Sequence, residues 1–406
     1  MYRPNIFNVS NLRDMLKDVK SYNFENYLIN FFNLKLNNNI LEKCVEIRRE
    51  RYKIKNIPYK NYNYLKNLNK NCENVVGYVR IPVGMIGPIN ISNDKKFIPF
   101  ATTEGALISS INRGCKLLNL SKNEIIVEDI GMTRSPIIKC KSLLEIQKIK
   151  NWINTNFNEV KIIFEKESNF TKLKKIDFLQ EGRHLHLRFC ATTGDAMGMN
   201  MVSKSSNNFL KFLKSKFDIK IISLSGNTCA DKKASAINLI KGRGKHVIME
   251  SLINKDDLFK ILKVTPDEII NLNIQKNLVG SSLAVTIGGN NCNASNIVSG
   301  LFIATGQDCG QIGTSSYCLI NMTKENENLL VTINMPTLEI ATIGGGTGLE
   351  DQENNLKIIH SNNKFDVKYL SKNVIYSVLA CELSLMSALC NDDLVKAHLK
   401  LNRGFK

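Results

Sequence analysis

The sequence predicts an α+β protein in which a small domain of alternating strands and helices interrupts a larger, helix-rich domain. Three observations lead to this prediction. The first 70 residues are polar and helical in character, residues 136–224 alternate between strand-like and helix-like patterns, and residues 276–390 are rich in helical segments. We therefore expect three domains: an N-terminal helical domain (1–70), a large domain (71–135 and 225–406) and an inserted small domain (136–224).

The large domain is expected to begin where the composition changes at Glu73. From there glycine and proline punctuate the apolar runs, as in ENVVGYVRIPVGMIGPI, which predicts turns and short strands packed in a core. After Thr102 the apolar residues recur at helical spacing, and this pattern predicts a helix that ends near Leu118.

The small domain is predicted from the order of its elements. Helical periodicity follows a first short strand, and one later strand alternates Leu185, Leu187 and Phe189. The order is βαββαβ, which is the ferredoxin-like pattern. The predicted elements are strand 137–140, helix 142–157, strands 172–179 and 183–191, helix 196–217 and strand 219–224.

The second part of the large domain is predicted to be mainly helical, with a strand at 329–335, a glycine loop at 344–346 and a last apolar helix at 374–389. No charged side chain lies between Lys276 and Asp308, a stretch long enough to cross a bilayer. Its middle reads GGNNCN, however, and unpartnered carboxamides are costly in lipid. A buried helical system fits better than a membrane span.

Composition limits the function classes. The chain has 406 residues and a formal net charge of +18, which attracts polyanions such as nucleic acids, membrane surfaces or phosphorylated ligands. The basic residues are spread along the chain, without a recognisable nucleic-acid-binding module. Eleven cysteines occur singly, with no metal-ligand spacing, and the N-terminus has no apolar signal segment. We expect a soluble, cytoplasmic protein that uses no metal.

Several ionisable residues stand in apolar or glycine-rich surroundings. Glu104 is the sole charge between Lys96 and Arg113, so we expect it to be partly buried, as a proton donor or as a helix-terminal residue capped by a threonine. Asp308 ends the uncharged stretch, as a functional carboxylate or as a helix cap. Lys232 lies in a predicted loop, where an ammonium can face an oxyanion or simply face solvent.

Two glycine segments and one histidine complete the candidates. TTGDAMGMN, at 192–200, joins a predicted strand to a helix, where free backbone N–H groups can hold a pyrophosphate, although a plain turn explains it equally well. The glycines at 344–346 permit close backbone approach or form only a turn. His398 is near the C-terminus, where a single histidine is usually a surface residue.

Taken together, these segments resemble the class I, eukaryotic-type hydroxymethylglutaryl-CoA (HMG-CoA) reductases. The similarity extends in collinear blocks over residues 57–403, and more weakly into VEIRR before them. The blocks are ENVVGYVRIPVGMIGPI, FATTEGALISSINRGCK, DIGMTRSP, RFCATTGDAMGMNMVSK, SLSGNTCADKKASAIN, KNLVGSSLAVTIGGNN, GQDCGQIGTSS, MPTLEIATIGGGTGL, ACELSLMSAL and LVKAHLKLNR.

The resemblance implies a large domain built around a central helix, with the ferredoxin-like domain as the NADP-binding insertion. It implies NADPH-dependent reduction of HMG-CoA to mevalonate and CoA by two hydride transfers, a step toward isoprenoids and sterols. It also implies a homodimer or homotetramer whose active sites are completed across the subunit interface. No metal, nucleic acid or membrane span is implied for this region.

The resemblance also assigns roles to individual positions. The implied catalytic residues are Glu104, Lys232, Asp308 and His398. The implied substrate-binding residues are Arg134, Ser225, Asp231, Lys233, Lys276 and Asn296 for the HMG portion and its surroundings, and Ser110, Asn112, Arg113, Lys116 and Lys263 for CoA. The implied cofactor-binding residues are Ser168, Asn169, Phe170, Asp195, Met197, Gly198, Met199, Asn200, Gly345 and Gly346.

The chain departs from the family pattern at three positions. Asn169 stands where class I members have an arginine for the 2′-phosphate of NADPH, so a weakened preference is expected and NADH is not excluded. Lys116 replaces an arginine and loses its bidentate geometry. Gly404 replaces a regulatory phosphoserine. The alternatives are mevalonate oxidation with NAD, a non-catalytic homologue and a basic nucleic-acid-binding protein.

Overall fold

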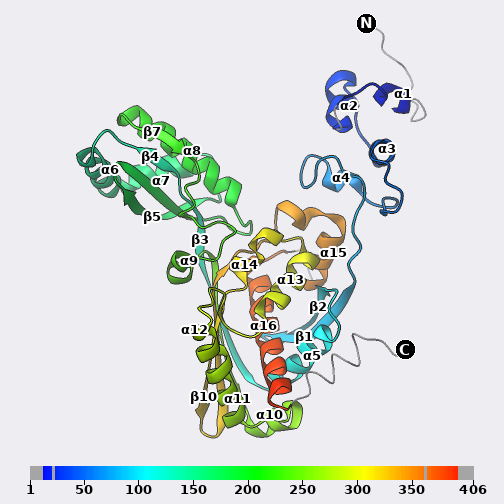
Figure 1. Cartoon of the computed structure of the whole chain (residues 1–406), viewed down its shortest axis with the longest axis vertical. Coiled ribbons are helices and arrows are strands. Elements are labelled where there is room, and N and C mark those ends of the chain that lie inside the picture. Colours follow the sequence, from blue (N-terminus) through cyan, green and yellow to red (C-terminus); the bar gives the residue numbers. More distant parts are fainter. Residues whose placement is uncertain (1–11, 21–22, 361–363, 392–406) are drawn as a thin grey trace.

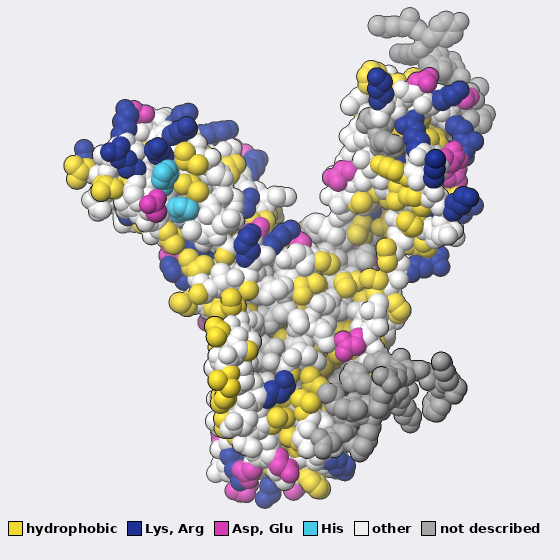
Figure 2. Space-filling view, viewed as in Figure 1, with side chains coloured by type: hydrophobic (Ala, Val, Ile, Leu, Met, Phe, Trp, Pro, Cys, Tyr) yellow, Lys and Arg dark blue, Asp and Glu magenta, His cyan; other side chains and the backbone are white. Residues whose placement is uncertain are grey.

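A computed structural model of the chain describes residues 12–20, 23–360 and 364–391. The described part forms a body from which two lobes rise on opposite sides, the N-terminal helices on one and the small domain on the other (Figure 1). Lysine and arginine side chains are prominent on both lobes in the space-filling view (Figure 2). Strands and helices are both abundant, so the predicted α+β class is confirmed.

From residue 12 on, the described part of the N-terminal lobe contains four helices: α1 (Leu12–Leu16), α2 (Phe24–Phe32), α3 (Asn38–Arg51) and α4 (Tyr64–Asn67). Asparagines start two of them, since Asn23 accepts a hydrogen bond from the Asn26 N–H at 3.1 Å and Asn37 accepts one from the Ile40 N–H at 3.0 Å. The fully buried guanidinium of Arg48 forms a two-pronged ion pair with Glu25, at 2.6 and 2.7 Å. This pair fixes α2 against α3.

The body contains a hairpin and a larger sheet. The hairpin is β1 (Val83–Ile91) with β2 (Asp94–Ala101), and α5 (Leu107–Leu118) packs beside it. The sheet runs β3-β8-β11-β10-β9, and of these strands the sequence predicted only part of β11. The strands are β3 (Lys122–Arg134), β8 (Gly244–Ile253), β11 (Asn328–Leu338), β10 (Cys318–Glu325) and β9 (Gly289–Asn290).

The small lobe contains β4 (Ile137–Lys139), α6 (Leu143–Thr155), α7 (Phe157–Glu165), β5 (Lys172–Glu181), β6 (His184–Thr192), α8 (Met199–Lys216) and β7 (Lys220–Ser223). Its strand order is β7-β4-β6-β5 with every neighbouring pair antiparallel, and it has a core of its own. Helix α7 occupies a stretch for which no regular element was predicted. The end of β3, at Met132, pairs with β6, so one long strand carries the body's sheet into the lobe.

Helix α16 (Val367–Cys390) is the long helix of the body and starts seven residues before the predicted 374–389 helix. It is long and apolar enough to cross a membrane, but 78% of its most apolar window is buried inside the protein. It packs against α5, α13 (Ala294–Thr305) and the sheet. A Cβ at Gly114 would lie 1.8 Å from the Ala380 carbonyl oxygen, so the close approach of α5 to α16 requires glycine there.

Short helices connect these elements: α9 (Ala236–Lys241), α10 (Lys255–Leu262), α11 (Pro266–Leu272), a π-helix (Asn273–Gly280), α12 (Ser281–Leu283), a 3₁₀ turn (Cys309–Gln311), α14 (Ile312–Ser315), a second 3₁₀ turn (Gly345–Gly348) and α15 (Glu350–Ile359). The expectation of a buried helical system at 276–308 is wrong in its first half. There Leu283 and Val285 are each 81% exposed, whereas α13 is largely buried.

Candidate active site

The structure brings together two of the four predicted catalytic side chains. Lys232 lies in the loop between β7 and α9, and Asp308 follows α13, where it begins the 3₁₀ turn. The Lys232 Nζ is 2.8 Å from Asp308 Oδ2, while Asp308 Oδ1 accepts the Gly310 N–H at 2.9 Å. The hydrogen bond to Asp308 raises the pKa of Lys232 against the opposing effect of partial burial. The lysine is therefore held as an ammonium.

Asp231 anchors the same loop from behind. It accepts hydrogen bonds from Gln311 Nε2 at 2.7 Å and from the buried Arg243 at 3.0 Å. Burial acts to raise the pKa of Asp231, but the Gln311 hydrogen bond and the Arg243 charge outweigh it and hold the pKa below its ordinary value. Asp231 is thus an anionic link between the Lys232 loop and the turn that carries Asp308.

The loop is also strained at the catalytic candidate itself. Lys232 has a φ of +56°, and Ala230, two residues earlier, has a φ of +50°. Side chains other than glycine rarely take this left-handed conformation, and it costs free energy that the surrounding contacts must offset. Such strain in a loop that presents an ammonium fits a functional position.

Glu104 does not have the predicted environment. Its side chain is exposed, which corrects the expectation of partial burial. It precedes α5, its N–H donates to Thr102 Oγ1 at 3.0 Å, and its Oε2 accepts from Asn296 Nδ2 at 3.0 Å. The structure thus joins two predicted site residues from α13 and from the start of α5. Charge isolation in the sequence indicated burial wrongly, because the carboxylate contacts the polar Asn296 side chain and remains exposed.

The other predicted HMG-binding residues lie at several places. Arg134 ends β3, and its buried Nε has no hydrogen-bond partner among the described residues. Ser225 Oγ is 3.7 Å from Cys229 Sγ, at the start of the Lys232 loop. Lys233 is exposed and donates to the Asp231 carbonyl at 3.4 Å. Lys276 is an exposed residue of the π-helix, close enough to the buried Glu382 to lower its pKa against the dominant effect of burial, which raises it.

Three predicted CoA-binding residues are engaged in the body itself. Arg113 Nε donates to Ser384 Oγ at 3.0 Å, and its NH2 donates to the Ser384 carbonyl at 2.5 Å. Ser110 Oγ lies 2.9 Å from the same Ser384 Oγ, and Asn112 accepts the Gly87 N–H at 2.7 Å. The two lysines of the set, Lys116 and Lys263, are exposed.

The two predicted dinucleotide loops lie side by side. Ala196 forms a parallel bridge with Ile343, and the Thr342 N–H donates to the Asp195 carbonyl at 2.9 Å. Gly198 has a φ of +90°, and a Cβ there would lie 2.2 Å from the Thr193 side chain. The loop places Met197 before α8 and the exposed Asn200 in its first turn. The N-terminus of this 18-residue helix offers backbone donors to an anion.

The second loop has a similar backbone. Gly345 has a φ of +57°, and a Cβ on it would meet nothing within 4 Å, so the loop borders open space. Gly346 packs on Gly306, where a Cβ would lie 2.6 Å from the Gly306 carbonyl oxygen. Asp195 also caps α16 by accepting the Val367 N–H at 3.0 Å. Glycine loops, a helix N-terminus and an open border suit a pyrophosphate-containing ligand.

The predicted 2′-phosphate region is the turn before β5. Ser168 Oγ accepts the N–H groups of Phe170 and Thr171 at 3.3 and 3.2 Å, so Ser168 stabilises the turn, and Phe170 is 70% exposed. Asn169 is exposed. The two lysines that could replace the missing arginine have partners already: Lys172 pairs with Glu165 at 3.3 Å and Lys174 donates to the Asp129 carbonyl at 2.6 Å.

The fourth predicted catalytic residue, His398, lies outside the described residues. Within the described ranges no group of three or more His, Cys, Asp or Glu side chains is arranged to hold a metal ion.

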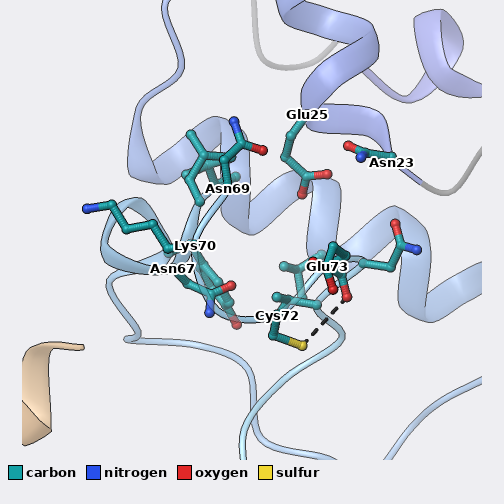
Figure 3. A pocket seen from close by; sticks show the side chains of 13 residues that line it. Asn23, Glu25, Asn67, Asn69, Lys70, Cys72 and Glu73 are labelled. Atoms are coloured by element: carbon teal, nitrogen blue, oxygen red, sulfur yellow. Dashed lines mark hydrogen bonds between the residues drawn. The ribbon is translucent and has the colours of Figure 1, made fainter. Parts of the chain in front are cut away.

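One hollow lies within the N-terminal lobe, and a second lies where this lobe joins the body. A cavity of about 40 Å³ is lined by polar residues that include Glu25, Cys72 and Glu73 (Figure 3), and it contains no predicted site residue. A wider hollow of about 330 Å³ is lined by Arg49, Tyr59, Tyr78 and Arg80 with two lysines. Basic groups and tyrosines complement a phosphorylated aromatic ligand. Tyr59 belongs to a tyrosine-rich stretch at 59–64, for which no role was predicted.

Comparisons with known proteins agree with the sequence resemblance. The family described as "Hydroxymethylglutaryl-coenzyme A reductase" matches residues 37–403. The chain is 48% identical over 361 residues to the 3-hydroxy-3-methylglutaryl-coenzyme A reductase of Agrotis ipsilon, covering 86% of this chain and 43% of that protein. It is 42% identical over 379 residues to reductase 2 of Arabidopsis thaliana, covering 89% and 67%. The chain thus spans less than half the length of the insect relative.

A solved structure has the same fold. It is the class II 3-hydroxy-3-methylglutaryl-CoA reductase from Streptococcus pneumoniae, described as bound to NADPH in open conformations, with a TM-score of 0.66 and 15% sequence identity. The similarity covers 94% of this chain and 100% of the bacterial chain.

Proposed function

The chain belongs to the hydroxymethylglutaryl-coenzyme A reductase family, and from this premise we propose that it reduces HMG-CoA to mevalonate and CoA with two molecules of NADPH. The observation that carries the proposal is the contact between Lys232 and Asp308, at 2.8 Å, in a strained loop anchored by Asp231. Hydride addition creates a negative charge on a carbonyl oxygen, and an ammonium held there by a carboxylate can stabilise that charge.

The proposed chemistry has two reductions. In the first, hydride reaches the thioester carbon and the carbonyl oxygen becomes an oxyanion, which Lys232 stabilises. The hemithioacetal then collapses, its C–S bond breaks, and CoA leaves as a thiolate that His398 protonates. In the second, hydride reaches the aldehyde carbon, Lys232 again stabilises the oxygen, and Glu104 supplies the proton that completes the alcohol.

Asp308 and Asn296 have supporting roles in this scheme. Asp308 keeps Lys232 charged and aimed, because its Oδ2 faces the ammonium while its Oδ1 is fixed by the Gly310 N–H. Asn296 orients Glu104 through a 3.0 Å hydrogen bond to Oε2. Arg134, at the end of β3, is proposed to bind the HMG carboxylate and hydroxyl together with Ser225, Lys233 and Lys276.

NADPH supplies the hydride when bound. The residues proposed to hold it are those of the paired loops, from Asp195 to Asn200 and at Gly345 and Gly346, where the N-terminus of α8 offers backbone donors to an anion and Gly345 borders open space. We assign this cofactor role to the domain at 136–224. At Ser168, Asn169 and Phe170 the chain lacks a guanidinium for the 2′-phosphate, so we propose a modest preference for NADPH over NADH.

The nucleotide end of CoA is proposed to bind basic side chains at two places. Lys116 and Lys263 are exposed and free to approach phosphates. The hollow beside Tyr59 and Arg49 adds an aromatic surface, where Arg49 already lies 4.3 Å from the Tyr59 ring centre. Ser110, Asn112 and Arg113 support this region by tying α5 to its neighbours.

We also propose that the protein works as a homodimer or homotetramer in the cytoplasm. Exposed apolar side chains cluster around the Lys276 segment, including Leu283 and Val285, and a second copy of the chain would remove them from water. All eleven cysteines are free thiols, which fits a reducing compartment.

A labelling experiment tests the proposed function. The chain is incubated with HMG-CoA and NADPH that carries deuterium at the transferable position. Two successive transfers place two deuterium atoms on the carbinol carbon of mevalonate, which mass spectrometry detects. Unlabelled product, or an absence of mevalonate while both substrates bind, contradicts the proposal.

A further inference from the structure

The structure contains a buried guanidinium that touches both halves of the candidate site. Arg243, which precedes β8, has an exposed fraction of 0%. Its NH2 donates to Asp231 Oδ1 at 3.0 Å and to Met199 Sδ at 2.9 Å. Its Nε donates to Thr133 Oγ1 at 2.9 Å, and its NH1 lies 2.5 Å from Glu339 Oε1.

These partners come from four separate segments of the chain. Asp231 precedes Lys232 in the loop with the catalytic candidate, and Met199 follows Gly198 at the start of α8. Thr133 precedes Arg134 at the end of β3, and Glu339 lies between β11 and the glycine loop at 344–346. A single nitrogen of Arg243 therefore bridges the Lys232 loop to the start of α8, and its other two nitrogens reach the end of β3 and the residue that follows β11.

The ion pair between Arg243 and Glu339 is not expected to add much to the free energy of unfolding. Both side chains are fully buried, and removing two charges from water can cost more than their attraction returns. Burial raises the pKa of Glu339 to about 7 although Arg243 opposes that rise. A pair of apolar side chains of similar volume would fill this space equally well. Because the chain has a guanidinium there instead, we infer that Arg243 serves to position the groups that it contacts.

We propose that Arg243 is a positioning residue that couples the two loops, so that an HMG-type carboxylate bound at the Lys232 loop increases the affinity for NADPH at the α8 loop. This inference rests on the proposed function. Coupling through one buried group is reciprocal, so NADPH increases the affinity for the carboxylate by the same factor.

The test uses free 3-hydroxy-3-methylglutarate, which has no thioester and cannot be reduced. The Kd for NADPH is measured by fluorescence titration of the full chain with and without a saturating concentration of this acid. We expect the acid to lower the Kd of the wild type by roughly 5-fold to 150-fold, the usual range for coupled sites. Arg243→Lys keeps the positive charge but loses the planar guanidinium that contacts several partners at once. In this variant we expect the ratio of the Kd without the acid to the Kd with it to fall to about one.

Two further variants make the result specific. Met199→Leu conserves volume and removes only the sulfur acceptor, so it should reduce the ratio while the Arg243 bond to Asp231 stays intact. Arg48→Lys makes the same change in another fully buried arginine, which pairs with Glu25 in the N-terminal lobe, and should keep the wild-type ratio.

The outcomes separate the inference from the function on which it rests. No coupling in the wild type, an unchanged ratio in Met199→Leu, or an equal loss in Arg48→Lys overturns the role of Arg243 even when HMG-CoA is turned over. If Arg243→Lys does not fold, Met199→Leu decides alone. Absence of NADPH binding together with absence of turnover overturns the proposed function instead.

Discussion

Replacing Lys232 with methionine should lower kcat strongly and the free energy of unfolding only slightly, because the ammonium matters far more to the reaction than to the fold. Methionine keeps the length and most of the apolar stem of lysine but removes the ammonium. Methionine is also an L-residue without β-branching, so the backbone conformation at φ +56° carries the same strain before and after the change. What is lost is the 2.8 Å contact with Asp308 and the cation that is proposed to stabilise the substrate oxygen.

The size of each effect follows from the geometry. The side chains of Lys232 and Asp308 are 49% and 35% exposed, and ion pairs with such exposure contribute about 0–1 kcal/mol to the free energy of unfolding. A preorganised donor at a developing oxyanion is worth about 3–4 kcal/mol of activation free energy, or roughly a 10²- to 10³-fold change in kcat. Lys232→Met should therefore lose activity by that factor while its Tm moves little.

The assay is steady-state NADPH oxidation with HMG-CoA, together with thermal unfolding of the same preparations. Lys324→Met is the matched control, since Lys324 also forms an ion pair, with Asp267 at 3.0 Å, but on the surface between β10 and α11. The control should keep wild-type kcat and KM. A loss in Lys232→Met that is under about fivefold, or that is matched by Lys324→Met, refutes the assignment of Lys232 to the oxyanion.

Three other perturbations have expected outcomes. Burial raises the pKa of Glu339 from 4.5 to about 7, so the folded chain retains a proton there that the unfolded chain releases; this stabilising contribution is present at low pH and is lost as the pH rises to about 7. Relative to Glu339→Gln, the wild type's free energy of unfolding should then fall across that window in urea titrations, and a constant difference contradicts the cause given. Asn169→Arg adds the missing guanidinium and should raise the ratio of kcat/KM for NADPH to that for NADH by at least about tenfold, as one charge-assisted hydrogen bond permits; a tenfold NADH preference in the wild type would contradict the proposed cofactor. Leu283→Glu places a charge on a side chain that is 81% exposed in the single chain, and should shift sedimentation toward the monomer without lowering Tm by more than a few degrees; an unchanged oligomer would exclude this surface from the interface.

The elements with regular periodicity could be predicted from sequence, and the pairing across the body could not. The small lobe has the predicted βαββαβ order with one further helix, α7, between α6 and β5. Strands β3, β8 and β10 were missed, and their partners in the sheet come from distant parts of the chain, since β8 pairs with β3 and β11, and β10 pairs with β11. Helix α7 was missed because FNEVKIIFE is short and directly follows α6.

In the candidate site, too, some features could be predicted from the sequence and others could not. The resemblance predicted the neighbours Lys232 and Asp308, which lie 76 positions apart in the sequence and meet at 2.8 Å. Burial of Glu104 was inferred from a lack of nearby charges, but local sequence cannot show which groups surround a side chain in space. Arg243 drew no attention because GRGK carries no motif, and its importance lies in contacts with four distant segments.

The stoichiometry of the reaction tests the central claim most directly. Under anaerobic conditions, the loss of dihydronicotinamide absorbance and the appearance of free CoA thiol are measured together on the wild-type chain with limiting HMG-CoA. Reduction of a thioester to an alcohol at one site requires two molecules of NADPH consumed for each CoA released. One NADPH per CoA, or CoA release without NADPH consumption, would contradict the account.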